Sequence, residues 1–442
     1  MMTTVVRRAG NIAGDPGIRT VARRYWPYVA LLAFTIVLPW LFYDWSKARH
    51  AGFVVSLLSQ MGLMIIFALS FNMQMGEAGL LSFGHAVYLG LGGYVTIHVI
   101  NAVRLGQFWL PMELMPLVGG LSGLMFSIVF GYMVTKRHGT AYAMITLGLG
   151  ELVTAAAVMF NGFFGGEGGI TANRILKTSL FGLSYGPDIQ VYYLILAWTA
   201  ICVLAMLLLT QVPLGRMANA CRDNFQRAQF VGYDPRMVRF YQCALSGFFA
   251  GVAGALYAID YEIVTFDAVS AILSGNALLM TFIGGVGVFW GPIVGAVLIT
   301  LLQSWMSLIS NAWLIYVAVL FIVMVIYAPG GVAGVTMAHV PIWRAGLLSA
   351  LAVPYLRILP PALIGVAGFA GLVELTYFVT IGSGQGKTLN VLHHAISTSS
   401  PTPWLAASAL FALGTAVALS QRRAFTIAWD ELTEHIRMKE RG

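Results

Sequence analysis

The sequence predicts an all-α polytopic membrane protein with about ten core transmembrane helices and two further helices near the C-terminus. Of its 442 residues, 59% are hydrophobic and only 10% are charged, and the mean hydropathy is +0.81. A soluble chain of this length needs far more charge on its surface. Apolar runs of about 20 residues recur along the chain, and each is long enough to cross a bilayer as a helix.

The N-terminal region reads as a cytoplasmic tail followed by a span. Residues 1–24 carry five arginines ahead of the first apolar run. That run, Tyr25–Tyr43, is too long for the apolar part of a signal peptide, and no small-x-small cleavage site follows it. We therefore expect it to be the first span. Six more core spans are expected, at 52–74, 79–100, 114–134, 141–161, 190–211 and 240–258.

The stretch 268–306 can be one long span or two short ones separated at Gly284–Gly287. Two spans, followed by one at 311–327, keep Arg344 and the charged C-terminus on the same side as the other basic loops, as the positive-inside rule requires. We therefore predict two. The expected organisation is a cytoplasmic tail (1–24), a core (25–335), an extension (336–420) with spans at 361–380 and 403–420 and an interfacial section at 341–358, and a cytoplasmic tail (421–442).

The segment Pro213–Phe240 is a long polar stretch between two apolar spans. Its five arginines place it in the cytoplasm; they are Arg216, Arg222, Arg227, Arg236 and Arg239. At 100° per residue, the small and apolar residues of its first part share one arc of roughly 160°, which is typical of a helix lying on a membrane. Phe230 falls on the polar side instead. An aromatic side chain on a wet helix face favours docking to a partner; the alternative is a helix that ends near Gly232, with Phe230 folded back on lipid.

Catalytic and metal-binding patterns are not found in the sequence. No nucleophile, base and orienting group form a set, the eight histidines are scattered, and the three cysteines show no metal spacing. The stretch Gly382–Thr388 suggests a phosphate-binding loop, but Ile381 stands where the pattern G-x-x-x-x-G-K-[ST] needs its first glycine. We predict no enzyme, no metal site and no cofactor in this chain.

Polar side chains in or near the spans are candidates for a translocation pathway, because burying them in hydrocarbon is costly. Glu77 and Glu167 lie near predicted span ends, where pairing with a neighbouring helix or contact with headgroups explains them equally well. The residues predicted to line the pathway are Ser82, His85, Thr146 and Glu151.

Several stretches together resemble the branched-chain amino-acid ABC importer permeases, in particular the second, M-type subunit. They are Gly79–Tyr94, Gly215–Gly232 with Leu245–Ala258, Leu278–Ala296 and Tyr327–Gly334. The resemblance covers roughly 50–335. Gln226-Arg227-Ala228 departs from the family pattern, which more often has an acidic residue and alanines there, and 336–442 have no counterpart in it.

The resemblance implies a permease subunit of an ATP-driven importer for branched-chain or related amino acids, in the bacterial inner membrane. The implied partners are a second permease subunit, two cytoplasmic ATPase subunits that hydrolyse the ATP, and a periplasmic substrate-binding protein. The ATPase-coupling loop is placed at Arg222, Asp223, Ala228, Phe230 and Gly232. The net charge of +8 then reflects orientation and contact with membrane lipid rather than a nucleic-acid partner.

An ion-coupled secondary transporter with an inverted repeat is the alternative function. Glycine-broken segments near 79–93 and 284–295 lie in the two halves of the chain, as such a repeat requires. Against it, no matched pair of intramembrane carboxylates occurs in the two halves, and the basic loop stays unexplained.

Overall fold

The computed structural model describes residues 33–41, 43–44, 49–50, 52–176, 178–380, 388–391, 394–397 and 400–441. The predicted tail 1–24, the start of the first predicted span and residues 381–387 of the glycine-rich stretch lie outside the described residues.

The described part of the chain is almost entirely helical, which confirms the predicted fold class. Nine of its helices are long and apolar enough to cross a membrane, and the bent pair α13 (Trp313–Tyr327) and α14 (Gly331–Arg344) could form a tenth span. Its strands form three short antiparallel pairs: β1 (Tyr43–Asp44) with β2 (Arg49–His50), β3 (Ile170–Thr171) with β4 (Ile263–Val264), and β5 (Thr388–Val391) with β6 (His394–Ser397).

The core helices fall close to the predicted spans, after a helical segment at 33–41. The long ones are α2 (Gly52–Asn72), α3 (Ala86–Arg104), α4 (Met115–Val134), α5 (Thr140–Met159), α7 (Asp188–Gln211), α10 (Pro235–Tyr261), α12 (Gly291–Ile309) and α13 (Trp313–Tyr327). The short ones are η1 (Met73–Glu77), η2 (Met112–Leu114), α6 (Asn161–Phe164), η3 (Gly166–Gly168), α8 (Pro213–Asp223), α9 (Phe225–Phe230), η4 (Phe266–Val269), α11 (Ala271–Gly284) and α14 (Gly331–Arg344).

Two core elements differ in extent from the predicted spans. The span expected from residue 79 begins as a helix only at Ala86, because α2 continues as the π-helix η1 and Gly79 then turns the chain with φ +68°. The stretch 268–306 is two helices, α11 and α12, as predicted. However, the 14 residues of α11 span only about 21 Å, less than the roughly 30 Å of a bilayer core, so α11 alone does not cross it.

The C-terminal extension forms longer helices than predicted. α15 (Leu348–Thr380) begins well before residue 361 and takes in part of the section expected at the interface. α16 (Pro401–Arg441) continues through the residues expected to form a tail. Beyond residue 420 the helix is packed on its neighbours as far as Trp429: Phe425 packs edge-on against Tyr355 of α15, and Trp429 packs edge-on against His339 of α14.

The centre of the molecule is a tight contact between α3, α4 and α10. α10 and α3 are the most deeply buried of the described spans. A Cβ on Gly251 would overlap the carbonyl oxygen of Gly119, and one on Gly254 would overlap the carbonyl oxygen of Leu89. Glycine at these positions lets the helix backbones touch, which is the main way that helices associate inside a membrane.

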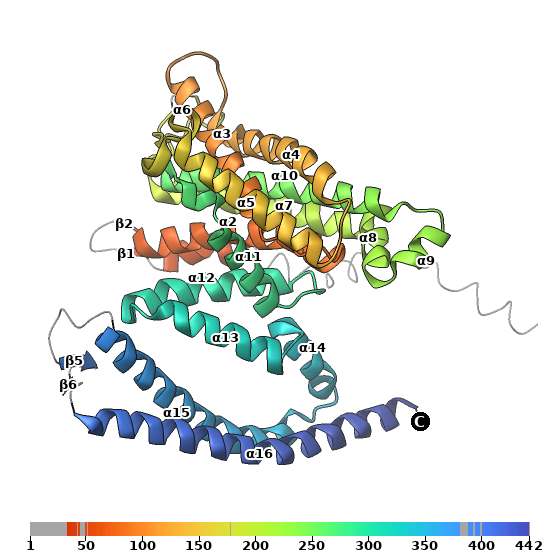
Figure 1. Cartoon of the computed structure of the whole chain (residues 1–442), viewed down its shortest axis with the longest axis vertical. Helices are drawn as coiled ribbons and strands as arrows, with labels where there is room; N and C mark the ends of the chain where they lie inside the picture. The colour runs from red at the N-terminus through yellow and green to blue at the C-terminus, as the bar shows by residue number, and fades with distance from the viewer. Residues whose placement is uncertain are drawn as a thin grey trace, which may run out of the picture.

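The elements that carry the candidate site lie at one end of the bundle. Figure 1 shows α8 and α9 at this end, with the C-terminal end of α16 on the same side and the strands β1, β2, β5 and β6 on the opposite side. The arginine-rich loop and the C-terminal end of α16 therefore lie at the same end of the molecule.

Candidate coupling and pathway site

The arginine-rich loop forms two helices rather than one. Asn224 breaks the chain between α8 and α9 with an extended backbone (φ −153°, ψ 99°), and its side-chain oxygen accepts a hydrogen bond from the Arg227 amide at 2.9 Å. Asn224 is therefore the N-cap of α9. An asparagine side chain that bonds the first amides of a new helix favours this cap over continuation of the preceding helix. The single arc calculated for one helix therefore holds only along α8.

The buried side of this pair of helices anchors it to the membrane domain. Ala218 and Cys221 of α8 and Ala228 of α9 are almost fully buried. They belong to a small apolar cluster with residues of four other segments, namely Ala78, Leu80, Val134, Tyr142 and Val238. The loop is therefore packed on the ends of α4, α5 and α10 and on the segment after η1.

Arg222 joins α8 directly to the end of α2. Its Nη1 donates a hydrogen bond to the carbonyl oxygen of Gly76 in η1. Its Nη2 also pairs with Asp223 at 3.0 Å, and a Cβ on Gly79 would come within 2.9 Å of its Cγ. The side chain thus lies flat against the turn that follows η1. A charge-assisted hydrogen bond of this kind is among the stronger polar contacts in a protein.

The other side of the loop is bare. The side chain of Phe230 is 90% exposed, and Val231 next to it is also exposed. Gly232 ends α9 with φ +92°, a conformation that suits glycine, and Asp234 then caps α10 by accepting a hydrogen bond from the Arg236 amide at 2.9 Å. The predicted loop residues are therefore divided between an anchored side (Arg222, Ala228) and an exposed tip (Phe230, Gly232), with Asp223 at the surface.

A buried polar network lies behind η1. It pairs Glu77 with a neighbouring helix, which is one of the two alternatives that the sequence left open, but the partner residues were not anticipated. The Gln242 amide donates to the Glu77 carboxylate at 2.6 Å, and the Gln74 amide donates to Ser246 at 2.5 Å. Tyr142 of α5 donates to the Gln74 side-chain oxygen at 3.3 Å. The signal was present in the chain: an amide side chain inside an apolar span is costly unless it is hydrogen-bonded. The network joins α5 and α10 to the same turn that Arg222 contacts.

Three of the four predicted pathway residues are buried inside this chain. His85 is fully buried, stacks on Phe67, and lies 2.9 Å from the Ser70 hydroxyl through its Nε2. Thr146 accepts a hydrogen bond from the Phe83 amide at 3.2 Å. Ser82, which precedes Phe83 in the sequence, is also buried. The structure brings these residues together where segment 82–85 crosses the inner face of α5.

Glu151 lies on the opposite, exposed face of α5. The same face carries Gly148, where an added Cβ would meet nothing within 4 Å, and Leu152, which is 64% exposed. A carboxylate in the middle of an apolar helix is expensive to leave against lipid. This face of α5 is therefore suited to a neighbouring subunit or to a water-filled passage.

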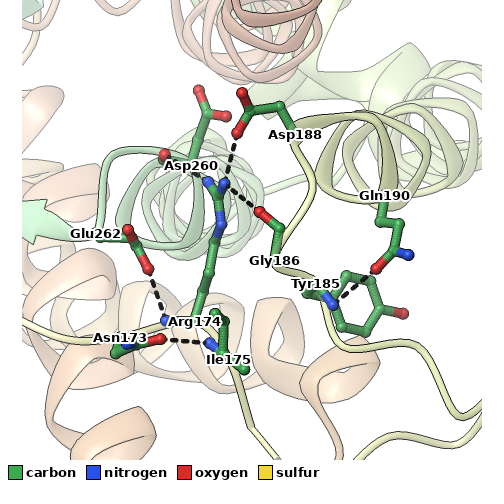
Figure 2. A network of polar contacts seen from close by, with 9 residues as sticks. All are labelled: Asn173, Arg174, Ile175, Tyr185, Gly186, Asp188, Gln190, Asp260 and Glu262. Atoms are coloured by element: carbon green, nitrogen blue, oxygen red, sulfur yellow. Dashed lines mark hydrogen bonds and ion pairs between the residues drawn. The ribbon is translucent and has the colours of Figure 1, made fainter. Parts of the chain in front are cut away.

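The far end of the bundle is fixed by a second polar network, which sequence reasoning also missed. Arg174 donates to Asp188 at 2.5 Å, to the Gly186 carbonyl at 3.0 Å and to the Asp260 carbonyl at 3.2 Å, and its amide donates to Glu262 at 2.9 Å (Figure 2). The network ties the loop before α7 to the end of α10. It holds this end together, as Arg222 does at the other.

Comparison with known proteins covers most of the chain. Residues 53–328 match the family described as "branched-chain amino acid transport system / permease component". The high-affinity branched-chain amino acid transport system permease protein LivM of Escherichia coli is 26% identical over an alignment of 297 positions that covers 62% of this chain and 68% of the relative. A probable branched-chain amino acid transport permease protein LivH of Methanocaldococcus jannaschii is 23% identical (62% of this chain, 89% of the relative). The ribose import permease protein RbsC of Haemophilus influenzae is 24% identical (66% and 91%). No solved structure matches the chain.

Proposed function

The chain belongs to the family of branched-chain amino acid transport permease components, and from this premise we propose that it is the pore-forming permease subunit of an ATP-driven importer. In this role it forms the translocation pathway together with a second permease subunit. Two cytoplasmic ATPase subunits hydrolyse the ATP, and a periplasmic binding protein delivers the solute. The membrane is the inner membrane of a bacterium.

The exposed tip of the α8–α9 loop is the observation that carries this proposal. Phe230 is an aromatic side chain left bare beside an exposed Val231, on a loop whose other side is firmly anchored. Exposed aromatic residues of this kind are typical anchors of protein interfaces. We assign the contact with the ATPase subunits to Phe230 and the neighbouring residues of α9.

Arg222 supplies the connection between that contact and the membrane helices. A movement of α8 pulls on the Gly76 carbonyl, and through η1 it reaches the Glu77–Gln242 and Gln74–Ser246 hydrogen bonds. Two distant sites are coupled when both of them shift the equilibrium of one packed element between two discrete positions. ATP binding in the partner subunits then displaces the ends of α2, α5 and α10.

The outer face of α5 is the proposed wall of the pathway. Glu151 lies there beside the unobstructed Gly148. A second permease subunit placed against this face would enclose a passage between the two chains and remove the carboxylate from lipid. Ser82 and His85 lie in the segment that packs against the inner face of α5, the face that carries Thr146. We therefore assign the influence of these three residues on transport to the packing of that helix.

The proposed solutes are branched-chain or related amino acids. This follows the names of the LivM and LivH relatives. The ribose permease is similar over a comparable share of this chain, so solute choice is assigned chiefly to the partner binding protein.

The test is reconstitution of the full transporter in vesicles. Uptake of labelled leucine should require ATP and should survive an ionophore that collapses ion gradients. Phe230→Asp should lower uptake per ATP hydrolysed by roughly tenfold or more, while the chain still inserts in the membrane. Leu105→Asp, at an exposed apolar position just after α3 and outside the loop, is the matched comparison and should leave this ratio unchanged. Uptake that needs an ion gradient and no ATP would support the secondary transporter instead.

A further inference from the structure

The α15–α16 hairpin carries a basic groove that the transport function does not use. The groove has a volume of about 120 Å³ and lies between the two helices. It is lined by Pro354, Arg357, Gln421, Ala424, Phe425 and Ala428. The hairpin lies outside the residues that match the permease family, so the groove belongs to the part of the chain without an assigned role.

The position of the groove along the hairpin places it at the edge of a bilayer's hydrocarbon core. α15 ends and α16 begins at the end of the molecule opposite α8 and α9, as Figure 1 shows. From Pro401 to Gln421 α16 advances about 30 Å, and from Thr380 back to Arg357 α15 covers about 35 Å. The hydrocarbon core of a bilayer is about 30 Å thick. The groove therefore opens at the headgroup level of the leaflet that α8 and α9 face.

The arginines at this depth are available to a ligand. Within the described part of the chain, the side chains of Arg357 and Arg423 make neither an ion pair nor a hydrogen bond. The Arg422 guanidinium points elsewhere, 5.5 Å from the ring centre of Tyr327. The nearest acidic residues along α16 are Asp430 and Glu431, about two turns further from the membrane.

We propose that this groove binds the headgroup phosphate of an anionic phospholipid, with Arg357 as the main contact and Arg423 at its edge. Arginine matches phosphate through two parallel hydrogen bonds, and basic pockets between helices at this leaflet suit anionic lipids. The apolar part of the groove, Ala424 and Phe425, then covers the first carbons of the lipid. The bound lipid fixes the hairpin in the leaflet.

The experiment measures lipid bound to the purified full-length chain by native mass spectrometry. Phosphatidylglycerol and phosphatidylcholine are titrated separately, with and without excess inorganic phosphate. We expect preferential binding of phosphatidylglycerol, about tenfold weaker in Arg357→Ala. Ala424→Trp, which fills the groove and keeps every charge, should lose binding as well, so the test does not depend on one variant.

Arg422→Ala is the matched control, because it removes the same charge at the same depth from a side chain held over Tyr327. It should change binding by about twofold at most. The proposal is overturned if Arg357→Ala binds like the parent chain or if Arg422→Ala weakens binding equally. It is also overturned if phosphatidylcholine binds as well, or if inorganic phosphate displaces the lipid, since a free anion would then be the ligand.

Discussion

Individual side chains divide the candidate site into an anchor and a tip. Arg222 is held against Gly76, whereas Phe230 is almost fully exposed only eight positions later. The sequence indicated the exposure of Phe230, because it fell among polar residues on the helical wheel. The sequence did not indicate the partner of Arg222, since the Gly76 carbonyl becomes available only where α2 changes to a π-helix. That change is a property of tertiary packing and leaves little trace in the sequence.

Arg222→Ala should weaken coupling more than stability. The variant loses a charge-assisted hydrogen bond worth about 1.5–3 kcal/mol, and the loop keeps its apolar anchor. We expect uptake per ATP hydrolysed to fall roughly tenfold in reconstituted vesicles, while the thermal unfolding temperature falls by only a few degrees. Arg216→Ala removes the same charge from an exposed position of α8 outside α9 and serves as the comparison. Equal uptake ratios in the two variants would contradict the role of Arg222.

Glu151→Leu distinguishes two possible environments of the outer face of α5, namely lipid and a polar passage. If this face met only lipid, leucine would be preferred and the variant would be more stable and fully active. Against a polar passage, we expect the loss of the carboxylate to lower the uptake rate severalfold, with the chain still assembled. Leu152→Ala, at an exposed neighbouring position, controls for lost packing. Measured uptake rates at equal protein content decide between the two.

Whole elements were predicted more reliably than their ends. The spans followed from apolar runs of sufficient length, and the division of 268–306 followed from its glycines and from charge balance. The break at Asn224 was missed because the helical wheel treats a segment as one continuous helix. Asparagine ends a helix only where capping the next helix stabilises the chain more than another helical turn does. The continuation of α16 past residue 420 was missed because the residues that Phe425 and Trp429 contact, Tyr355 and His339, lie far away in the sequence.

Gly254→Val should damage the central packing of α3, α4 and α10. The new side chain would overlap the Leu89 carbonyl, so the helices must separate, at a cost of about 1–3 kcal/mol or more. We expect a lower unfolding temperature in detergent and less protein in the membrane. Gly275→Val is the matched control, because a Cβ at Gly275 meets nothing within 4 Å. A Gly254→Val variant as stable as Gly275→Val would contradict the close-contact account.

The molecule as a whole combines a family core with an added hairpin. The core has a polar clamp at each end, Arg222 at one and Arg174 at the other, joined by the glycine-packed helices α3 and α10. Such a bundle transmits a displacement at α8 because tightly packed helices move as units and deform little. The hairpin α15–α16 contacts this core through α13 and α14, for example by the Tyr316–Glu374 hydrogen bond of 2.7 Å, and leaves α8 and α9 uncovered.

The exposure and sidedness of Phe230 can be measured directly with a cysteine at that position. The three native cysteines are buried, and burial raises the pKa of the Cys221 thiol, so little of it is thiolate at neutral pH and the background is low. Phe230→Cys should react with a membrane-impermeant maleimide in inside-out vesicles only, and co-expressed ATPase subunits should protect it. Labelling from the periplasmic side, or labelling that the ATPases leave unchanged, would contradict the proposal that this loop is the contact through which ATP drives the bundle.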